Sequence, residues 1–451
     1  MRALRIAVNV ALATLLVFAQ VGVAAAQGRT VGLVRDAEIE SLVRDYAAPI
    51  FAAAGLAADN VSVHLVQDST LNAFVSGGQR VFVNTGLLQV AESPGEIIGV
   101  IAHETGHVAG GHLVRLRDAL NKASVQTIAS AVVSILAGIA AGPQVASAIA
   151  AGGQQLALNG VLSYTQAQEA SADAAGLSFL DRTGQSAQGM LTMLKRLQRI
   201  EATSLGPPPG LVRTHPPTQS RIATVRNHMA FSRFTNVKPP AELQYRHDRM
   251  RAKLAGFLLP FDDVLKIYPE INVSEPARYA RAVALFRRGS LAPALELIDG
   301  LIADRPDDPF YRELKGQMLF ENGRIEAAIA PYRKAVALAP AEPLIRLELA
   351  RVLIETGDDG VLGEAGDALE AVLRAEAGNA EAWRLLAIVR GRNGDFGKMS
   401  LAQAELALLR GNNDDALAQA DKAEQLLPVG SPGWLRAQDI SQLADQRKSR
   451  R

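Results

Sequence analysis

The sequence lacks cysteine altogether, and it lacks any excess of charge of one sign. Without cysteine the chain forms no disulfide, carries no lipid on a cysteine and performs no thiol chemistry. Its 47 Lys and Arg residues balance 46 Asp and Glu residues, for a formal net charge of +1. No overall field therefore attracts nucleic acid, and we expect no nucleic-acid partner. Histidine is also scarce, with seven in 451 residues, so a regular spacing between two histidines is informative.

The N-terminus has the features of a secretory signal, which we place at residues 1–26. Two arginines supply positive charge, an apolar stretch runs from Ile6 to Val23, and three alanines follow it. We therefore expect cleavage near Ala26, and export of a chain without cysteine fits a bacterial periplasm. An uncleaved membrane anchor is the competing interpretation, because the apolar stretch approaches spanning length.

Five consecutive residues, His103-Glu104-Thr105-Gly106-His107, form the HExxH pattern of zinc metalloproteases. On a helix, His103 and His107 fall one turn apart on the same face and can bind one metal ion together. Glu104 lies about 100° around the helix axis from His103, within reach of a water held by that metal. We therefore expect a zinc site with Glu104 as its catalytic base.

The flanking sequence predicts that this motif lies on a buried helix. Ser93-Pro94-Gly95-Glu96 is typical of a capping box at a helix start. Gly99, Gly106 and Gly110 form a smooth strip beside the histidines. Glycine inside a helix costs roughly 1 kcal/mol relative to alanine, so three on one strip suggest that a neighbouring backbone packs there. That neighbour is where we expect the third metal ligand.

Two further segments contain candidate site residues. Residues 161–176 have helical character and place Glu169 and Asp173 one turn apart. Such a pair is usually an exposed acidic edge, but after HExxH Glu169 becomes a candidate third ligand. Asp173 could then hold the free ring N–H of a ligating histidine. His215 follows a proline-rich stretch. A loop histidine ordinarily faces solvent, whereas in a zinc enzyme it could fill the fourth metal position or hydrogen-bond the transition state.

Short β-prone runs precede the motif, at Val61–Val66, Leu71–Val75 and Arg80–Asn84. The last two surround a hairpin signal at residues 76–79. A sheet edge beside the motif would let a substrate add as an extra strand, and a purely structural hairpin explains the pattern equally well.

Residues 124–158 carry no charge, and Pro143 divides them into two segments. Neither segment comfortably reaches the roughly 20 residues that a spanning helix needs. We interpret them as a helical hairpin packed over the active site, with contact to a membrane surface as the alternative.

The second half of the chain contains an internal repeat. Turns ending at Gly289, Gly323, Gly357 and Gly394 stand 34, 34 and 37 residues apart, and Gly411 follows 17 residues further on. A period of 34 is typical of tetratricopeptide (TPR) repeats, which are pairs of antiparallel helices. We expect about four repeats, with the longer interval caused by an insertion at residues 358–366.

These observations divide the chain into functional parts. We expect a protease domain at residues 27–255, a linker at 256–275 and a TPR-like repeat domain at 276–446. Repeat domains of this kind bind peptides or proteins on a concave face and rarely perform chemistry.

Three segments occur in a fixed order before the repeats: HETGH at 103–107, QEASADAAG at 168–176 and RTHPPTQSR at 213–221. This order resembles the M48 family of zinc metalloproteases. The resemblance implies a mainly α fold, with a gluzincin-like, zincin-type α+β protease domain that contains a small sheet, followed by an α-solenoid of TPR-like helix pairs. It also implies one zinc ion per chain and an endopeptidase that degrades misfolded or stalled outer-membrane proteins, with the repeats docking onto the outer-membrane assembly machinery.

The resemblance also implies a role for each matching residue. The zinc ligands would be His103, His107 and Glu169, the general base Glu104, and the residue that supports a ligand Asp173. His215 resembles a family histidine that can close the metal site and restrain activity. Arg221 matches an arginine downstream of that histidine, and its role stays open. The alternatives are a periplasmic chaperone or scaffold that acts through its repeats, and a membrane-anchored protease.

Overall fold

A computed structural model of the chain describes residues 32–57, 62–76, 80–112, 166–203, 215 and 218–449. The expected signal at 1–26, the centre of the hairpin turn at 77–79 and the uncharged stretch at 124–158 lie outside the described residues. Within the described ranges, no helix combines the length and the apolar character that a membrane span requires.

The N-terminal half is built on a small mixed sheet. Its strands are β1 (Leu33–Val34), β2 (Ser62–Val66), β3 (Ala73–Ser76) and β4 (Arg80–Asn84), in the spatial order β1-β2-β4-β3. β2 and β4 run parallel, whereas β1 pairs antiparallel with β2 and β3 pairs antiparallel with β4. The predicted hairpin therefore exists, and β3 forms one edge of the described sheet.

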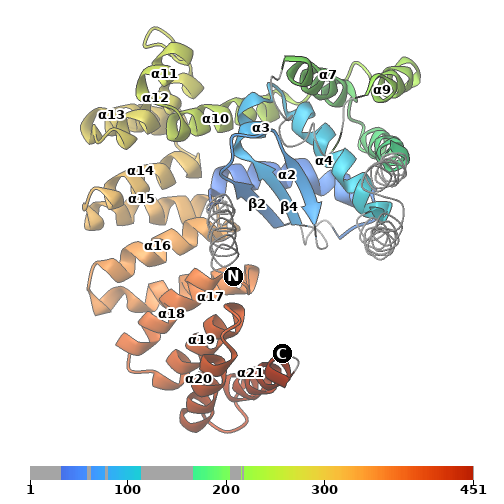
Figure 1. Cartoon of the computed structure of the whole chain (residues 1–451). Coiled ribbons are helices and arrows are strands. Elements are labelled where there is room, and N and C mark those ends of the chain that lie inside the picture. The colour runs from blue at the N-terminus through green and yellow to red at the C-terminus, as the bar shows by residue number, and fades with distance from the viewer. Residues whose placement is uncertain are drawn as a thin grey trace, which may run out of the picture.

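Helices pack against this sheet and contribute most of the N-terminal core (Figure 1). They are α2 (Ala37–Ala53), α3 (Thr85–Val90), α4 (Pro94–Ala109), a helix covering residues 166–182, α7 (Gln188–Thr203), α9 (Gln219–Phe231) and α10 (Ala241–Leu258). The mainly helical fold class with a small sheet is thus confirmed.

The HExxH motif lies on α4, whose start differs in detail from the predicted capping box. Ser93 is the N-cap residue, but its side chain makes no capping hydrogen bond. The Glu96 carboxylate instead accepts a hydrogen bond from the backbone N–H of Glu92, at 3.0 Å. It also pairs with Arg196 of α7 at 3.3 Å, so the same carboxylate links the start of α4 to α7.

The C-terminal half is a solenoid of antiparallel helix pairs (Figure 1). Five pairs follow one another within residues 275–449: α12 (Glu275–Arg287) with α13 (Leu291–Asp304), α14 (Pro309–Glu321) with α15 (Ile325–Leu338), α16 (Pro343–Glu355) with α17 (Leu362–Ala375), α18 (Ala380–Arg392) with α19 (Phe396–Leu409), and α20 (Asn413–Leu426) with α21 (Pro432–Ser449). This is one pair more than the four expected, because Gly411 lies between two pairs and precedes a complete fifth pair.

The turns of the solenoid fall where the repeat predicts them. All five turn glycines have φ between 71° and 83°, a left-handed conformation that glycine adopts without strain. The expected insertion contains a short 3-10 helix, Asp359–Val361, before α17. The expected linker at 256–275 contains the end of α10 and the whole of α11 (Phe261–Ile267), so helices bridge the two halves of the chain.

The N-terminal unit lies on the inner side of the arc that the solenoid forms (Figure 1). Ala37, at the start of α2, is buried within the apolar cluster of the middle repeats. Arg35 pairs with Glu376 at 2.9 Å, and Arg44 pairs with Glu342 at 2.7 Å. These contacts join residues about 300 positions apart and hold the two halves of the chain together. Local sequence patterns do not predict such contacts.

His247 connects three elements inside the N-terminal unit. From α10 it reaches the Tyr46 hydroxyl of α2 at 3.0 Å and the carbonyl of Ala91 at 2.9 Å. Because a carbonyl only accepts, Nε2 carries the proton and Nδ1 accepts from the tyrosine hydroxyl. The side chain is fully buried, and burial lowers the pKa of His247 to about 4.

This neutral histidine predicts a loss of stability in mild acid. The unfolded chain, with a histidine pKa of about 6.5, binds more protons between pH 6.5 and pH 4 than the folded chain does. Stability should therefore fall as the pH drops through this window, by about 2 kcal/mol at pH 5 for this residue alone. We expect urea titrations at pH 8 and pH 5 to show a smaller acid loss for His247→Gln than for wild type. Equal losses would assign the acid sensitivity to other groups.

Candidate metal centre

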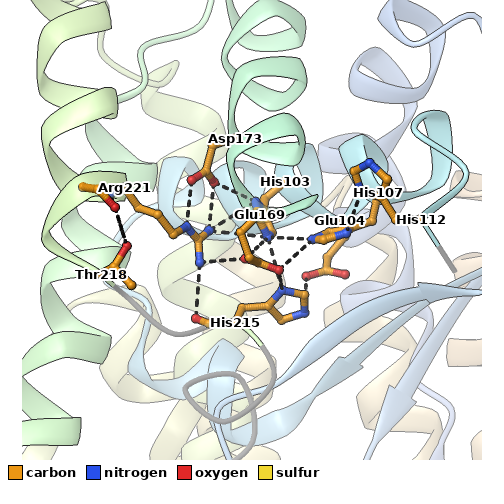
Figure 2. A network of polar contacts seen from close by, with 10 residues as sticks. His103, Glu104, His107, His112, Glu169, Asp173, His215, Thr218 and Arg221 are labelled. Atoms are coloured by element: carbon orange, nitrogen blue, oxygen red, sulfur yellow. Dashed lines mark hydrogen bonds and ion pairs between the residues drawn. The ribbon is translucent and has the colours of Figure 1, made fainter. Parts of the chain in front are cut away.

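The HExxH motif folds as predicted and brings its two histidines together. His103 and His107 lie one turn apart on α4, and their Nε2 atoms are 3.1 Å from each other (Figure 2). Both side chains are buried. Two imidazole nitrogens at this distance face a common point, as ligands of one metal ion do.

Glu169 reaches the same point from the helix at residues 166–182. Its Oε2 lies 3.2 Å from His103 Nε2, and its Oε1 lies 3.2 Å from His107 Nε2. The approach depends on Gly106, because a Cβ atom there would lie 2.6 Å from the carbonyl oxygen of Ala172. The predicted close packing is therefore present, and the neighbouring backbone is the one that carries Glu169.

The other two glycines of the strip behave differently from each other. A Cβ atom on Gly99 would lie 2.8 Å from the backbone of Met190 in α7, so this glycine also permits a close helix contact. A Cβ atom on Gly110 would instead meet the ring of His112, at 2.4 Å. The prediction of a neighbouring backbone is thus confirmed at Gly99 and Gly106 and is wrong at Gly110.

His215 completes the group of donors. Its Nδ1 lies 2.8 Å from Glu169 Oε1 and 3.3 Å from His103 Nε2. One donor atom from each of His103, His107, Glu169 and His215 lies within 4.8 Å of the other three. Bonds of about 2.0–2.1 Å to zinc place tetrahedral donors about 3.3 Å apart. The observed separations therefore fit a four-coordinate metal ion.

The second ring nitrogen of each motif histidine also has a partner. Asp173 Oδ1 lies 2.8 Å from His103 Nδ1, as the sequence predicts. His112 Nδ1 lies 3.1 Å from His107 Nδ1, and His112 is buried. Such contacts leave Nε2 free to bind metal and hold each ring in place.

The contact of His112 with His107 is a feature of the site that the sequence did not predict. His112 continues the helical spacing of Ile97, Ile101 and Val108, so its position along the sequence alone predicts a place on the apolar side of the helix. The chain leaves the helix at Gly110 and turns at Gly111, which has φ 62°, and this turn folds the ring back onto His107. The pair of glycines before a third histidine was the available signal.

Arg221 contacts Asp173, Glu169 and the backbone of His215. Its guanidinium holds Asp173 with two hydrogen bonds of 2.7 and 2.8 Å, and Nη1 lies 2.8 Å from Glu169 Oε2 (Figure 2). The same Nη1 donates to the backbone carbonyl of His215 at 3.3 Å. Thr218 caps α9 beside it. Arg221 therefore holds both carboxylates and the backbone carbonyl of His215.

The charges of the centre favour a divalent cation. Three carboxylates (Glu104, Glu169 and Asp173) face one guanidinium (Arg221), which leaves two negative formal charges among buried groups when the histidines are neutral, as metal ligands are. Without a metal ion, a proton on His103 offsets one of these charges. Burial lowers the pKa of His103, but hydrogen bonds with Asp173 and Glu169 outweigh it and raise this pKa to about 9. Burial alone would raise the pKa of Glu169, and its three histidine contacts hold it far below its usual range. A buried negative charge of this size needs a cation partner.

Glu104 lies next to the four candidate metal ligands but is not one of them. Its Oε1 is buried, has no hydrogen-bond partner among the described residues and lies 3.5 Å from His215 Nε2. A carboxylate oxygen held without a donor can accept a proton from a group placed between it and the metal position.

An apolar pocket opens beside Glu104 and His215. Its walls include Met190, Met193, Leu194 and Leu197 of α7, and His103, Glu104 and His215 close it on the other side. Its volume of about 20 Å³ holds no more than a water-sized group. The pocket is therefore too small for a substrate side chain in this conformation.

Comparison with known proteins agrees with both halves of this architecture. Residues 34–229 match Peptidase family M48, and residues 301–424 match the cytochrome c-type biogenesis protein H TPR domain. The beta-barrel assembly-enhancing protease of Yersinia pestis is 26% identical over 377 residues, which cover 82% of this chain and 75% of that protein. The protein of the same name from Escherichia coli K12 is 27% identical over 376 residues, covering 81% and 75%.

Among solved structures, a crystal structure of MamA matches with 16% identity and a TM-score of 0.29, over 38% of this chain and 95% of that one. The family matches place the metal centre within the first region and the helix pairs within the second. The chain therefore carries an M48 metallopeptidase domain followed by a TPR domain.

Proposed function

We propose that this protein is a zinc-dependent endopeptidase whose active site is normally held closed. The observation that carries the proposal is the group of four donors at tetrahedral spacing with Glu104 beside it. His103, His107 and Glu169 would hold one zinc ion, and Asp173 and His112 would orient the two imidazoles.

Each residue around the metal position would have a separate role in peptide hydrolysis. A zinc ion bound there supplies Lewis acidity, which activates a water and polarises a peptide carbonyl. Glu104 takes the proton of the attacking water and delivers it to the leaving amine. Arg221 keeps Glu169 and Asp173 charged and in position. Once the loop opens, the apolar pocket along α7 would receive a hydrophobic side chain of the substrate.

The closed state depends on His215. Its Nδ1 takes the position that the fourth ligand of a tetrahedral site would have, and its ring also borders the apolar pocket. A catalytic zinc site needs that fourth position for water or substrate. The hydrogen bond from Arg221 to the His215 carbonyl supports the loop in this arrangement. We infer that activity requires this histidine to leave the donor group.

We also propose a substrate class and a location, for which the names of the similar proteins give partial support. The two relatives are named as beta-barrel assembly-enhancing proteases, which supports a role connected with the assembly of outer-membrane proteins. Within that role, we propose misfolded or stalled outer-membrane proteins as the substrates. The TPR domain would then dock onto the assembly machinery, and the protein would act in the periplasm after cleavage near Ala26. N-terminal sequencing of the mature protein with membrane fractionation separates this location from a membrane-anchored form.

Removal of the metal tests the enzymatic proposal. A chelator should abolish the cleavage of an unfolded protein such as denatured casein, and one equivalent of zinc per chain should restore it. Metal analysis should find about one zinc per chain in the wild type and far less in Glu169→Gln, which loses a charged ligand. Cleavage that survives complete removal of the metal would contradict the proposal.

A chaperone or scaffold that acts through the repeats is the second candidate function. The small pocket and the position of His215 favour it, because both leave little room for a peptide substrate at the metal position in this conformation. The suppression of aggregation of an unfolded outer-membrane protein separates the two functions. A scaffold keeps this activity in Glu104→Gln, whereas a protein that acts only by cleavage loses its effect.

A further inference from the structure

A groove lies between α7 and α9 on the surface of the N-terminal unit. The two helices lie side by side at an edge of this unit, away from the solenoid (Figure 1). The groove has a volume of about 370 Å³, and binding sites for small ligands typically have roughly 300–1,000 Å³. It shares no lining residue with the apolar pocket of the metal centre. The groove is therefore a separate feature with room for a small ligand.

Three positively charged side chains line this groove, and no carboxylate does. Lys195 and Arg199 come from α7, and Arg226 comes from α9. The other lining residues are uncharged: Thr192, Gln198, Gln219 and Ile222. Three like charges around one groove repel one another, so an anion bound among them is stabilised.

The three cations have no ion partner among the described residues. Most other Lys and Arg side chains of the N-terminal unit form an ion pair or a hydrogen bond, as Arg196 does with Glu96. Within the described part of the chain, the side chains of Lys195, Arg199 and Arg226 form neither. Arg199 and Arg226 are also exposed, so an anion in solution can reach them.

The neighbouring sequence supplies no counter-charge. Glu201 is the one acidic residue of α7, and it does not line the groove, whereas α9 contains no acidic residue. Residues 204–217, which join the two helices, contain no Asp or Glu. A run of like charges along one helix is usually a solvated face. Here the packing of two helices brings together charges that lie about 30 positions apart in the sequence.

The side chains of the groove suit a phosphate group. An arginine guanidinium presents its N–H donors in a fork that matches phosphate oxygens, and lysine adds a compact positive charge. The amides of Gln198 and Gln219 offer further N–H donors. A phosphate monoester carries about two negative charges at neutral pH, whereas a carboxylate carries one. Three cations therefore match a phosphate monoester better than a single carboxylate.

We propose that the groove between α7 and α9 binds a phosphate monoester, with Arg199 and Arg226 donating hydrogen bonds from two helices and Lys195 adding charge. This inference goes beyond peptide hydrolysis, because none of the three residues belongs to the metal centre. Two sources supply this chemistry, a soluble phosphate monoester and the phosphate headgroup of a lipid.

Calorimetric titration of the full-length protein with methyl phosphate tests the inference. Methyl sulfate is the matched control, because it has nearly the same shape and one negative charge fewer at pH 8. We expect saturable binding of methyl phosphate, at least about tenfold tighter than that of methyl sulfate, since a charge-assisted hydrogen bond contributes roughly this factor. No binding of methyl phosphate, together with no binding to phosphatidic acid in vesicles, would overturn the inference.

Co-sedimentation with vesicles separates the two sources of phosphate. Phosphatidylcholine vesicles with phosphatidic acid display a phosphate monoester, and vesicles with phosphatidylglycerol display a phosphate diester of lower charge. Tighter binding to phosphatidic acid than to methyl phosphate supports a lipid headgroup as the ligand. Binding of methyl phosphate without binding to the vesicles supports a soluble ligand.

Arginine variants locate the bound phosphate. Arg199→Gln and Arg226→Gln should each weaken the binding of methyl phosphate at least about tenfold. Both residues are exposed, so each variant should unfold at the wild-type temperature. Arg233→Gln is the matched control, because it removes the same charge just after the end of α9 and outside the groove. It should leave binding unchanged.

Three results of these measurements would overturn the inference. Methyl phosphate binding that neither groove variant changes would assign the phosphate to another site, including the metal centre. Equal losses in all three arginine variants would show a general effect of charge. Binding of a peptide with three consecutive aspartates, in the absence of any phosphate binding, would assign the groove to an acidic protein segment. None of these outcomes depends on whether the protein cleaves peptides.

Discussion

Replacement of Glu104 by glutamine is expected to remove proteolysis while leaving metal binding intact. Glutamine keeps the shape of the side chain but cannot take a proton from the attacking water. General-base catalysis contributes roughly 10²- to 10⁴-fold, so kcat/KM on denatured casein should fall by at least this factor. Because Glu104 lies outside the four donors, the zinc content should stay near one per chain.

A matched control removes a glutamate that is not at the site. Glu201 is exposed at the end of α7, and Glu201→Gln should cleave casein at the wild-type rate. Wild-type cleavage by Glu104→Gln would refute its assignment as the base. Loss of zinc together with activity would instead make Glu104 part of the metal-binding group.

Replacement of His215 by alanine is expected to raise basal proteolysis. The change removes Nδ1 from the donor group and opens one wall of the apolar pocket. If the open form makes up about 1–10% of the wild-type molecules, full release increases the rate by about 10- to 100-fold. Initial rates on casein, measured at equal zinc content, test this expectation.

The direction of the His215 effect decides between two roles. Slower cleavage with zinc retained would show that the histidine assists the transition state and does not block it. No change would remove it from the mechanism. His228→Ala is the matched control, because His228 lies on α9 and pairs with Asp181 away from the metal centre. It should leave the rate unchanged.

The grouping of the candidate metal ligands could be predicted from the sequence because it follows from helix periodicity. A spacing of four residues places His103 and His107 on one face whatever surrounds them. Gly106 has no other evident purpose than close packing, and the backbone that packs on it carries Glu169 three residues before Ala172. The solenoid could also be predicted from a local pattern. Its turns need residues in the left-handed conformation, so glycine recurs at the repeat period.

The remaining features depend on tertiary contacts that no local pattern encodes. His112 follows the helical spacing of an apolar stripe, and the turn at Gly111 directs it to His107 instead. The pairing of Arg35 with Glu376 depends on how the solenoid curves around the N-terminal unit. Arg221 was noted without a role, because its contacts with both carboxylates appear only when α9 is in place.

The central claim is that four side chains from three separate segments bind one zinc ion in a closed site. Anomalous diffraction at the zinc edge, from crystals of the zinc-loaded wild-type protein, tests it most directly. We predict one zinc per chain, bound by His103 Nε2, His107 Nε2, the Glu169 carboxylate and His215 Nδ1. Zinc bound without Glu169, or bound elsewhere on the chain, would contradict the account.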